Sequence, residues 1–309
     1  VAAHIRDEGD HLVRAVKEFL TILREAKARG VISHHKASVS EENWGKVTHT
    51  LRMIEEANRS CMEVYCDIYP YTACSTSLRA VFVQKEDLSV GLKAASERLK
   101  DQAYRERIRS YVYGRFGETD YSWALVTISK EPKYRGKRIS EIAEMLGTDP
   151  VDAIMDVMYD NAMEVSACYF SACEEDLKTV LAFPRTMICT DSGIPSSPVY
   201  HPRVRASFPR VLGKYVREEQ VTTLPEMIRK MTSMPAAVYG LSGKGLIREG
   251  MDADLCIFDA EKIRDRATYN DCMQRAEGLN YVIVDGEVVV ENAVFNGTKR
   301  GRFLLSETQ

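Results

Sequence analysis

The sequence predicts an α/β fold with parallel strands, followed by a smaller all-β module. Apolar runs within residues 1–5 and 31–35 each lead into histidine, and an amphipathic segment separates them. Strand–helix–strand units of about thirty residues pair their strands in parallel through right-handed crossovers. From Ser242 onward, apolar and polar residues alternate on both sides of Asp285–Gly286, a pattern typical of strands joined by a tight hairpin turn.

The first two helices follow from the spacing of apolar residues. Between Asp10 and Gly30 such residues recur every three or four positions, and Gly30 is expected to end the helix. After VISHH and a polar loop with NWGK, the same spacing over 47–57 predicts a second helix. The next apolar run, EVYCDIYPY, predicts a third strand that ends at Pro70.

The segment from about 84 to 120 differs in character. It is rich in Lys, Glu and Arg and helical in pattern, so we expect a helical insertion after the third strand. The strand order is expected to resume with YSWALVTISK, and Asp149–Pro150 suits the start of a later helix. TMICTD, residues 186–191, is a further short strand that ends in an acid, and LPEMIRKMTSMPAAVYGL reads as helical.

Composition excludes several classes of function. The chain has 309 residues, 45% of them hydrophobic, which suits one large domain or a large domain with a smaller one. With 42 basic and 45 acidic residues the net charge is −3, which does not favour nucleic-acid or membrane partners. The eight cysteines form no CxxC pair, so we expect reduced thiols in a cytoplasmic protein.

Three polar residues stand at the ends of expected strands: His4, His34 and Asp191. Side chains at the carboxyl ends of parallel strands converge on one face, and two histidines with a carboxylate can bind a divalent metal and transfer protons. Each residue also has a structural reading, as a hydrogen-bonded histidine or a helix cap. Alternation puts His34 and His35 on opposite faces, and the pattern leaves open which of the two points inward.

Several motifs together resemble one family. HIRDEGD, SHHKAS with NWGK, DIYPYTA, TDSG with HPR, FPRVLGKY and PAAVYGLSGKGLIREGMDADLCIFD occur in this order along the chain. They resemble the D-aminoacylases, the N-acyl-D-amino-acid deacylases of the amidohydrolase superfamily. The resemblance implies metal-dependent hydrolysis of the linear amide of small N-acyl-D-amino acids, with one or two zinc ions as cofactor.

The resemblance also implies a fold and a set of site residues. The family folds as a (β/α)₈ barrel with a β-sandwich, so residues 1–241 would hold barrel strands 5–8 and residues 242–309 part of the sandwich. His4 and His34 would be the metal ligands of strands 5 and 6. Asp191, after strand 8, would transfer protons and contact a second metal. Four further residues match substrate contacts, Lys36 and Arg203 for the carboxylate and Tyr69 and Ser75 around the scissile amide. Three of these residues also have a structural interpretation: Lys36 as a solvated cation of a loop, Tyr69 as a tyrosine of the core and Ser75 as a turn residue.

The match begins at the expected fifth strand. The family carries an HxH pair on the first barrel strand, and none occurs among the six histidines. We therefore expect the C-terminal part of a longer protein, inactive by itself, that self-associates or pairs with the missing half because open strand edges and apolar faces favour association. Two alternatives remain: a cyclic-amide hydrolase of the dihydroorotase or hydantoinase kind, and a non-catalytic interaction module.

Overall fold

A parallel sheet forms the centre of the body of the molecule. The structure is a computed structural model that describes residues 1–195 and 197–304. The sheet order is β1-β2-β3-β7, all parallel, with Ala2 paired to Val31, Gly30 to Val64 and Cys66 to Thr186. Its strands are β1 (Ala2–Ala3), β2 (Gly30–Ile32), β3 (Val64–Ile68) and β7 (Thr186–Ile188). An α/β fold with parallel strands is therefore confirmed.

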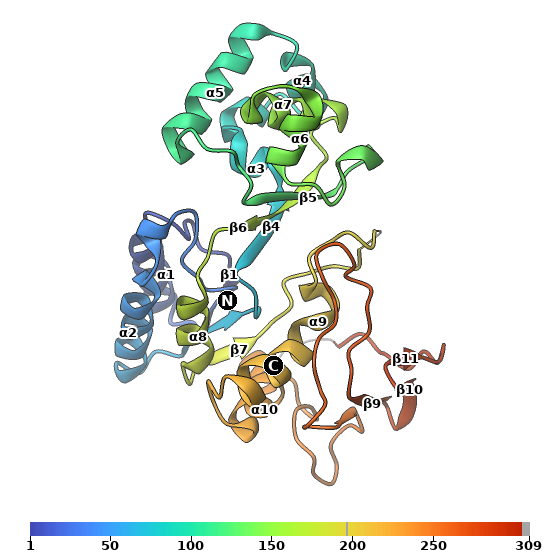
Figure 1. The fold of residues 1–309 in the computed structure, drawn as a ribbon. Helices are drawn as coiled ribbons and strands as arrows, with labels where there is room; N and C mark the ends of the chain where they lie inside the picture. The colour runs from blue at the N-terminus through green and yellow to red at the C-terminus, as the bar shows by residue number, and fades with distance from the viewer. Residues whose placement is uncertain (196, 305–309) are drawn as a thin grey trace.

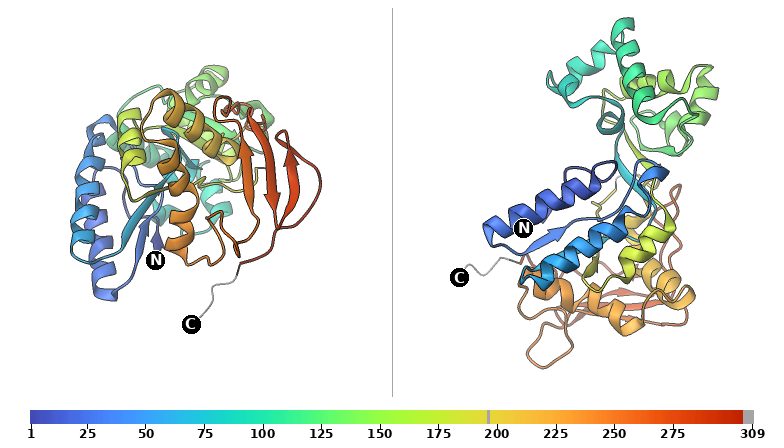
Figure 2. Two further views of the ribbon diagram at one scale, coloured as in Figure 1. Left: turned by 90° about the horizontal axis from the view of Figure 1, so that it is seen from below. Right: turned by 90° about the vertical axis from the view of Figure 1, so that its left-hand side faces the viewer.

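Helices pack beside this sheet and bury its apolar side chains. They are α1 (Leu12–Ala26), α2 (Lys46–Arg59), which follows the short η1 (Glu41–Asn43), and α8 (Glu174–Ala182). Figure 2 shows α1 and α2 lying side by side next to the strands. The apolar stripe of α1, including Val16, Phe19 and Leu23, joins the core cluster that contains Ile32, because residues three and four apart share one helix face.

The end of α1 differs from the expectation. Lys27, with φ of 48°, and not Gly30, adopts the left-handed conformation that ends the helix. Gly30 instead opens β2, where any side chain would collide with Leu23. The glycine therefore allows the strand to approach the helix closely.

A separate lobe, residues 73–170, stands away from the body and is reached through the strands β4 and β6 (Figure 1). Its antiparallel sheet has the order β4-β6-β5. Its elements are β4 (Ala73–Ser77), α3 (Leu78–Phe82), η2 (Lys85–Leu88), α4 (Leu92–Arg98), α5 (Gln102–Phe116), β5 (Ala124–Ile128), η3 (Pro132–Tyr134), α6 (Ile139–Leu146), α7 (Pro150–Asp160) and β6 (Ser166–Phe170). The lobe is thus larger than the helical insertion expected over 84–120.

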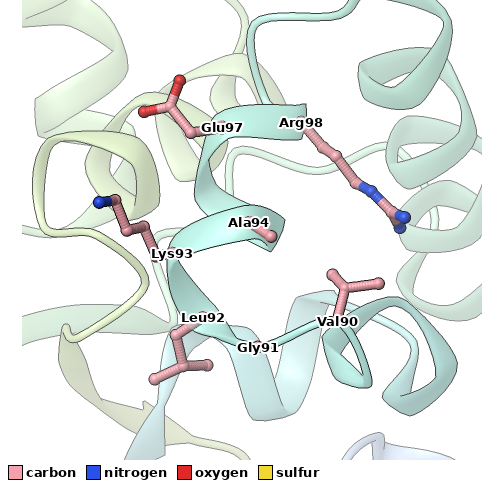
Figure 3. Close-up of a pocket in the computed structure, with 7 residues that line it drawn as sticks. All are labelled: Val90, Gly91, Leu92, Lys93, Ala94, Glu97 and Arg98. Carbon is pink, nitrogen blue, oxygen red and sulfur yellow. The ribbon is translucent and has the colours of Figure 1, made fainter.

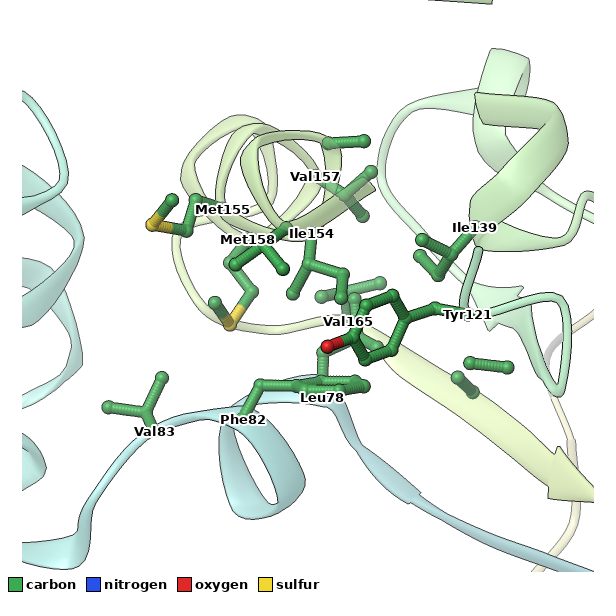
Figure 4. Packing of buried hydrophobic residues seen from close by; sticks show 14 of the residues in the cluster. Leu78, Phe82, Val83, Tyr121, Ile139, Ile154, Met155, Val157, Met158 and Val165 are labelled. Atoms are coloured by element: carbon green, nitrogen blue, oxygen red, sulfur yellow. The ribbon is translucent and has the colours of Figure 1, made fainter. Parts of the chain in front are cut away.

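The lobe has a hydrophobic core of its own, which Figure 4 shows around Phe82, Tyr121 and Ile154. The stretch YSWALVTISK does not resume the parallel order as expected, because its strand β5 pairs antiparallel with β6 in the lobe. A short run that is buried on both faces has the same sequence pattern in either kind of sheet. Asp149 caps α7 through the backbone N–H of Val151, as Asp149–Pro150 predicted.

The C-terminal part combines helices with a second antiparallel sheet. The helical elements are α9 (Arg203–Arg210), which continues into the π-helical η4 (Val211–Glu218), α10 (Leu224–Met231) and α11 (Ser233–Tyr239). The sheet, in the order β11-β10-β9-β8, contains β8 (Leu255–Phe258), β9 (Leu279–Val284), β10 (Glu287–Glu291) and β11 (Val294–Phe295). Asp285 and Gly286 have φ of 52° and 78°, which confirms the predicted hairpin turn.

Two further features concern the whole described chain. None of the helices in the described ranges has the length and apolar character needed to cross a membrane. All eight cysteines are free thiols.

Candidate active site

The candidate site lies where the parallel strands of the body end. His4 follows β1, His34 follows β2, Asp67 lies within β3 and Asp191 follows β7. The backbone N–H of His34 donates to Asp67 Oδ1 at 2.7 Å, which links two neighbouring strand ends. His34 and Asp191 have φ of 43° and 45°, a left-handed conformation that turns each chain segment directly after its strand.

The two histidines face each other. His4 Nδ1 lies 2.8 Å from His34 Nε2, and the ring centroids are 4.7 Å apart. Glu8 Oε1 lies 2.6 Å from His34 Nδ1 on the other side of the ring. His4 is exposed, Glu8 half-buried and His34 buried, and their ligand atoms all lie within 4.8 Å of one another.

The structure also separates His34 from His35. His35 is fully buried and its Nε2 lies 2.9 Å from Thr50 Oγ1 on α2, while burial lowers its pKa to about 4. His34 therefore faces the strand-end cluster and His35 faces the helices.

Lys36 and Glu8 form an ion pair beside the histidines. Lys36 is 7% exposed, and its Nζ lies 2.7 Å from Glu8 Oε1 and 3.0 Å from the carbonyl oxygen of His34. Burial raises the pKa of Glu8, but Lys36 and His34 outweigh burial and lower that pKa to about 2. Glu8 was not singled out from the sequence. It lies within HIRDEGD, but no strand end or periodic pattern marks it.

Arg203 approaches the same region from the start of α9. It is 4% exposed, and its guanidinium lies 4.4 Å from the centroid of the Tyr69 ring. Its Nη1 lies 2.8 Å from Asp191 Oδ2 without the alignment of a hydrogen bond. Among the described residues, neither Nε nor Nη1 of Arg203 has a hydrogen-bond partner. A buried guanidinium with unused donors is suited to receive an anionic ligand.

His201 links the start of α9, next to Arg203, to the start of the lobe. Its Nδ1 accepts from the backbone N–H of Arg203 at 3.1 Å, and its Nε2 lies 2.9 Å from the carbonyl oxygen of Ala73 at the start of the lobe. Burial lowers the pKa of His201 to about 3, so the ring is neutral and donates from Nε2. His201 was not predicted as a site residue.

Tyr69 lies between the two cations. It is buried, with Lys36 Nζ at 5.5 Å and the Arg203 guanidinium at 4.4 Å from its ring centroid. Burial raises the pKa of the Tyr69 hydroxyl well above its usual value. Ser75 lies further along, on β4, where it faces Cys168 of β6. The structure thus brings six predicted residues to one region, His4, His34, Lys36, Tyr69, Asp191 and Arg203, and places Ser75 on the first strand of the lobe.

The donor atoms fit a divalent metal ion. Imidazoles are ligands that zinc takes in catalytic sites, and His4 Nδ1 and His34 Nε2 lie 2.8 Å apart, close enough to face one ion. By contrast, the hollow of about 740 Å³ in Figure 3, which α4 lines with Lys93, Glu97 and Arg98, lies in the lobe and includes no candidate site residue.

Comparison with known proteins identifies the family of the chain. Residues 89–290 match the model of the family described as "Amidohydrolase family". The chain belongs to the amidohydrolase family. It is 34% identical over 303 residues to the D-aminoacylase of Alcaligenes xylosoxydans xylosoxydans, which covers 98% of this chain and 54% of that protein. Matches to dihydroorotases cover 30% of this chain or less.

The chain is also similar to solved structures of deacylases, in sequence and in fold. N-acyl-D-glutamate deacylase from Bordetella bronchiseptica, in complex with zinc and a phosphonate that mimics the tetrahedral intermediate, is 31% identical with a TM-score of 0.75, covering 93% of this chain and 52% of that one. A D-aminoacylase with a binuclear metal centre is 33% identical with a TM-score of 0.77, covering 97% of this chain and 55% of that one. The chain spans about half the length of the relatives it matches.

Proposed function

We propose that the protein hydrolyses the linear amide of N-acyl-D-amino acids to a carboxylate and a free D-amino acid. The observation that carries this proposal is that two facing imidazoles share a region with a buried guanidinium, two of whose nitrogens have no hydrogen-bond partner among the described residues. Such a site can hold a metal ion and a substrate carboxylate next to each other. The whole-chain similarity to D-aminoacylase supports the same substrate class.

The proposal includes a fold and a location. Strands β1, β2, β3 and β7 would be strands 5–8 of a (β/α)₈ barrel within residues 1–241, and residues 242–309 would be part of a β-sandwich. The parallel order and the polar residues at the carboxyl ends of the strands support this assignment. Eight free thiols support a cytoplasmic location.

His4 and His34 would hold the metal ion, with Asp191 beside them. When bound, zinc lowers the pKa of a water and polarises the amide carbonyl. Asp191, with 38% of its side chain exposed, accepts the proton of the attacking water and passes it to the leaving amine. The Tyr69 hydroxyl stays protonated at neutral pH because burial raises its pKa, so it can donate a hydrogen bond to the developing oxyanion.

Arg203 and Lys36 would bind the α-carboxylate of the substrate. The guanidinium can use the donors that have no partner in the structure. Lys36 already donates to Glu8 and to the His34 carbonyl, so it contributes its remaining N–H. These two cations would fix the carboxylate while the metal site holds the amide, which supplies two of the three contacts that selection of one enantiomer requires. Ser75, on β4, would add a hydrogen bond to the substrate amide.

The test is an assay of the complete gene product that includes these 309 residues. We expect hydrolysis of N-acetyl-D-methionine or N-acetyl-D-glutamate, none of the L-enantiomers, loss of activity with a chelator and recovery with Zn²⁺. Arg203→Ala should raise KM about 10- to 100-fold, the equivalent of one charge-assisted hydrogen bond, while Arg205→Ala on the exposed face of α9 should not.

Two outcomes would contradict the proposal. Hydrolysis of dihydroorotate or a hydantoin without hydrolysis of N-acyl-D-amino acids would favour a cyclic-amide hydrolase. No metal binding and no hydrolysis would favour a non-catalytic module.

A further inference from the structure

Glu8 is held in place by its backbone as well as by its side chain. The backbone N–H of Ser38 donates to the Glu8 carbonyl oxygen at 2.9 Å, so the loop after β1 is tied to the loop after β2. The carboxylate points inward with 15% of the side chain exposed. Glu8 is therefore fixed relative to His34 and Lys36, which lie on the second loop.

The contact of Glu8 with His34 determines which ring nitrogen carries the proton. An ionised carboxylate can only accept, so the 2.6 Å contact between Glu8 Oε1 and His34 Nδ1 requires a proton on Nδ1. The neutral ring then has a lone pair on Nε2, the atom that faces His4 Nδ1 at 2.8 Å. Metal ions bind the nitrogen without the proton, so this tautomer prepares His34 to act as a ligand through Nε2.

Lys36 removes the alternative that Glu8 is itself a ligand. Its Nζ lies 2.7 Å from each oxygen of Glu8, so both carboxylate oxygens face a cation. A metal ion at Glu8 would have to displace this ammonium group from a buried position. The carboxylate is thus already occupied by Lys36 and His34.

We propose that Glu8 is a positioning residue that holds His34 in its Nδ1-protonated tautomer and thereby directs His34 Nε2 to the metal. The inference rests on the proposed function for its biological meaning, but the tautomer itself is a property of the chain. Lys36 has a second role in this arrangement, because it keeps the Glu8 carboxylate oriented toward the ring.

Removal of Glu8 should exchange the two tautomers. Lys36 Nζ lies 3.1 Å from His34 Nδ1, so without the carboxylate the ammonium can donate to Nδ1 and leave the proton on Nε2. The Nε2 atom would then have to lose a proton before binding metal. Loss of such a carboxylate partner typically weakens metal affinity 10- to 100-fold.

The deciding experiment is ¹⁵N NMR of the metal-free protein with ¹⁵N-labelled histidine, the His34 signals being assigned with a His34→Gln variant. We expect protonated Nδ1 in the natural protein and protonated Nε2 in Glu8→Leu. The matched control is Glu18→Leu, which removes an exposed carboxylate of α1 and should change nothing at His34. Protonated Nε2 in the natural protein would overturn the proposal, whatever the protein hydrolyses.

A second measurement uses Zn²⁺ alone, titrated against a chromophoric chelator. Zinc affinity should fall 10- to 100-fold in Glu8→Leu and stay unchanged in Glu18→Leu. Glu8→Leu leaves the buried Lys36 without its partner, which can destabilise the fold. The double variant Glu8→Leu/Lys36→Met removes both charges, so tautomer and zinc affinity can be measured without an unpaired buried lysine. A double variant with the natural tautomer and natural zinc affinity would contradict a positioning role for Glu8.

Discussion

The lobe and the body each contain a cluster of charged residues, and the two clusters differ in how their charges are satisfied. In the lobe, Arg109 contacts Asp149 at 2.8 Å and Asp152 at 2.7 Å, and Arg105 contacts Asp152 and Asp156, both at 2.9 Å. In the body, Arg203 is more deeply buried, yet two of its nitrogens have no hydrogen-bond partner among the described residues.

Under the proposed function, this difference separates a structural cluster from one that would bind a ligand. The paired cluster of the lobe joins α5 to α7, and every arginine in it already has its carboxylates. In the body, Arg203 has one carboxylate, Asp191, 2.8 Å from Nη1, but its Nε and Nη1 make no aligned hydrogen bond, at a position where burial makes such donors costly. Such a cost persists where a ligand completes the contacts, which is how binding sites depart from otherwise consistent folds.

The largest expected effect compares one carboxylate from each cluster. Asp191→Asn should lower kcat about 1000-fold, because the amide cannot accept the proton of the attacking water, while zinc binding is retained. Asp156→Asn, in the lobe, should leave kcat unchanged, since this side chain pairs with Arg105 and belongs to none of the strand ends of the body. Steady-state hydrolysis and zinc titration of both variants check this. Full activity of Asp191→Asn would remove Asp191 from the mechanism.

The next largest expected effect compares the loss of unfolding free energy when one arginine is removed from each cluster. Arg109→Ala leaves Asp149 and Asp152 without this partner and should cost about 2–3 kcal/mol of unfolding free energy, somewhat less than loss of a fully buried pair. Arg203→Ala should cost less, about 1 kcal/mol, because it loses one ion pair with the half-exposed Asp191 but also removes buried donors that make no hydrogen bond. Urea denaturation measures both. If Arg203→Ala is the more destabilising of the two, the contrast between the clusters fails.

The smallest expected effect is a decrease in the free energy of unfolding of the body as the pH falls. His35 and His201 are buried and their pKa values are lowered by burial to about 4 and about 3, whereas the lobe contains no histidine. Below pH 6.5 the unfolded chain binds protons that the folded body does not, so stability decreases as the pH falls. Each histidine should contribute a loss of about 1 kcal/mol between pH 6.5 and 5.5.

Two tryptophans allow this loss to be located. Trp44 lies in the body and Trp123 in the lobe, so Trp123→Phe and Trp44→Phe variants each report one region by fluorescence. The urea midpoint reported by Trp44 should fall more between pH 6.5 and 5.5 than the midpoint reported by Trp123. Equal shifts would show that the two regions unfold as one unit.

The sequence predicted the body better than the lobe for a physical reason. Helices α1 and α2 and the parallel strands repeat one unit, so their apolar spacing and connection lengths leave few alternatives. Strand β5 was assigned to the wrong sheet because a five-residue strand with four buried residues carries no information about the direction of its partner strand. Gly30 was taken for a helix end because the same residue serves a left-handed turn and a close contact equally well.

The candidate site was predicted where residues end a strand. His4, His34 and Asp191 follow β1, β2 and β7, and this place in the topology marks them. Glu8 and His201 were missed because each makes its contact with a residue distant in sequence. Glu8 contacts His34, and His201 contacts the carbonyl oxygen of Ala73 at the start of the lobe. No local pattern encodes such contacts, so only the folded arrangement reveals them.

The pairing of Ala73 with Phe170 has one more consequence. These residues bound the lobe and lie directly opposite each other in the register of β4 and β6, so the chain leaves the body and returns to it at the same place. For the body, the whole lobe is equivalent to the tip of a hairpin. Insertions, deletions or exchange of everything between these two residues can therefore alter the lobe while the distances among the strand-end residues stay as they are.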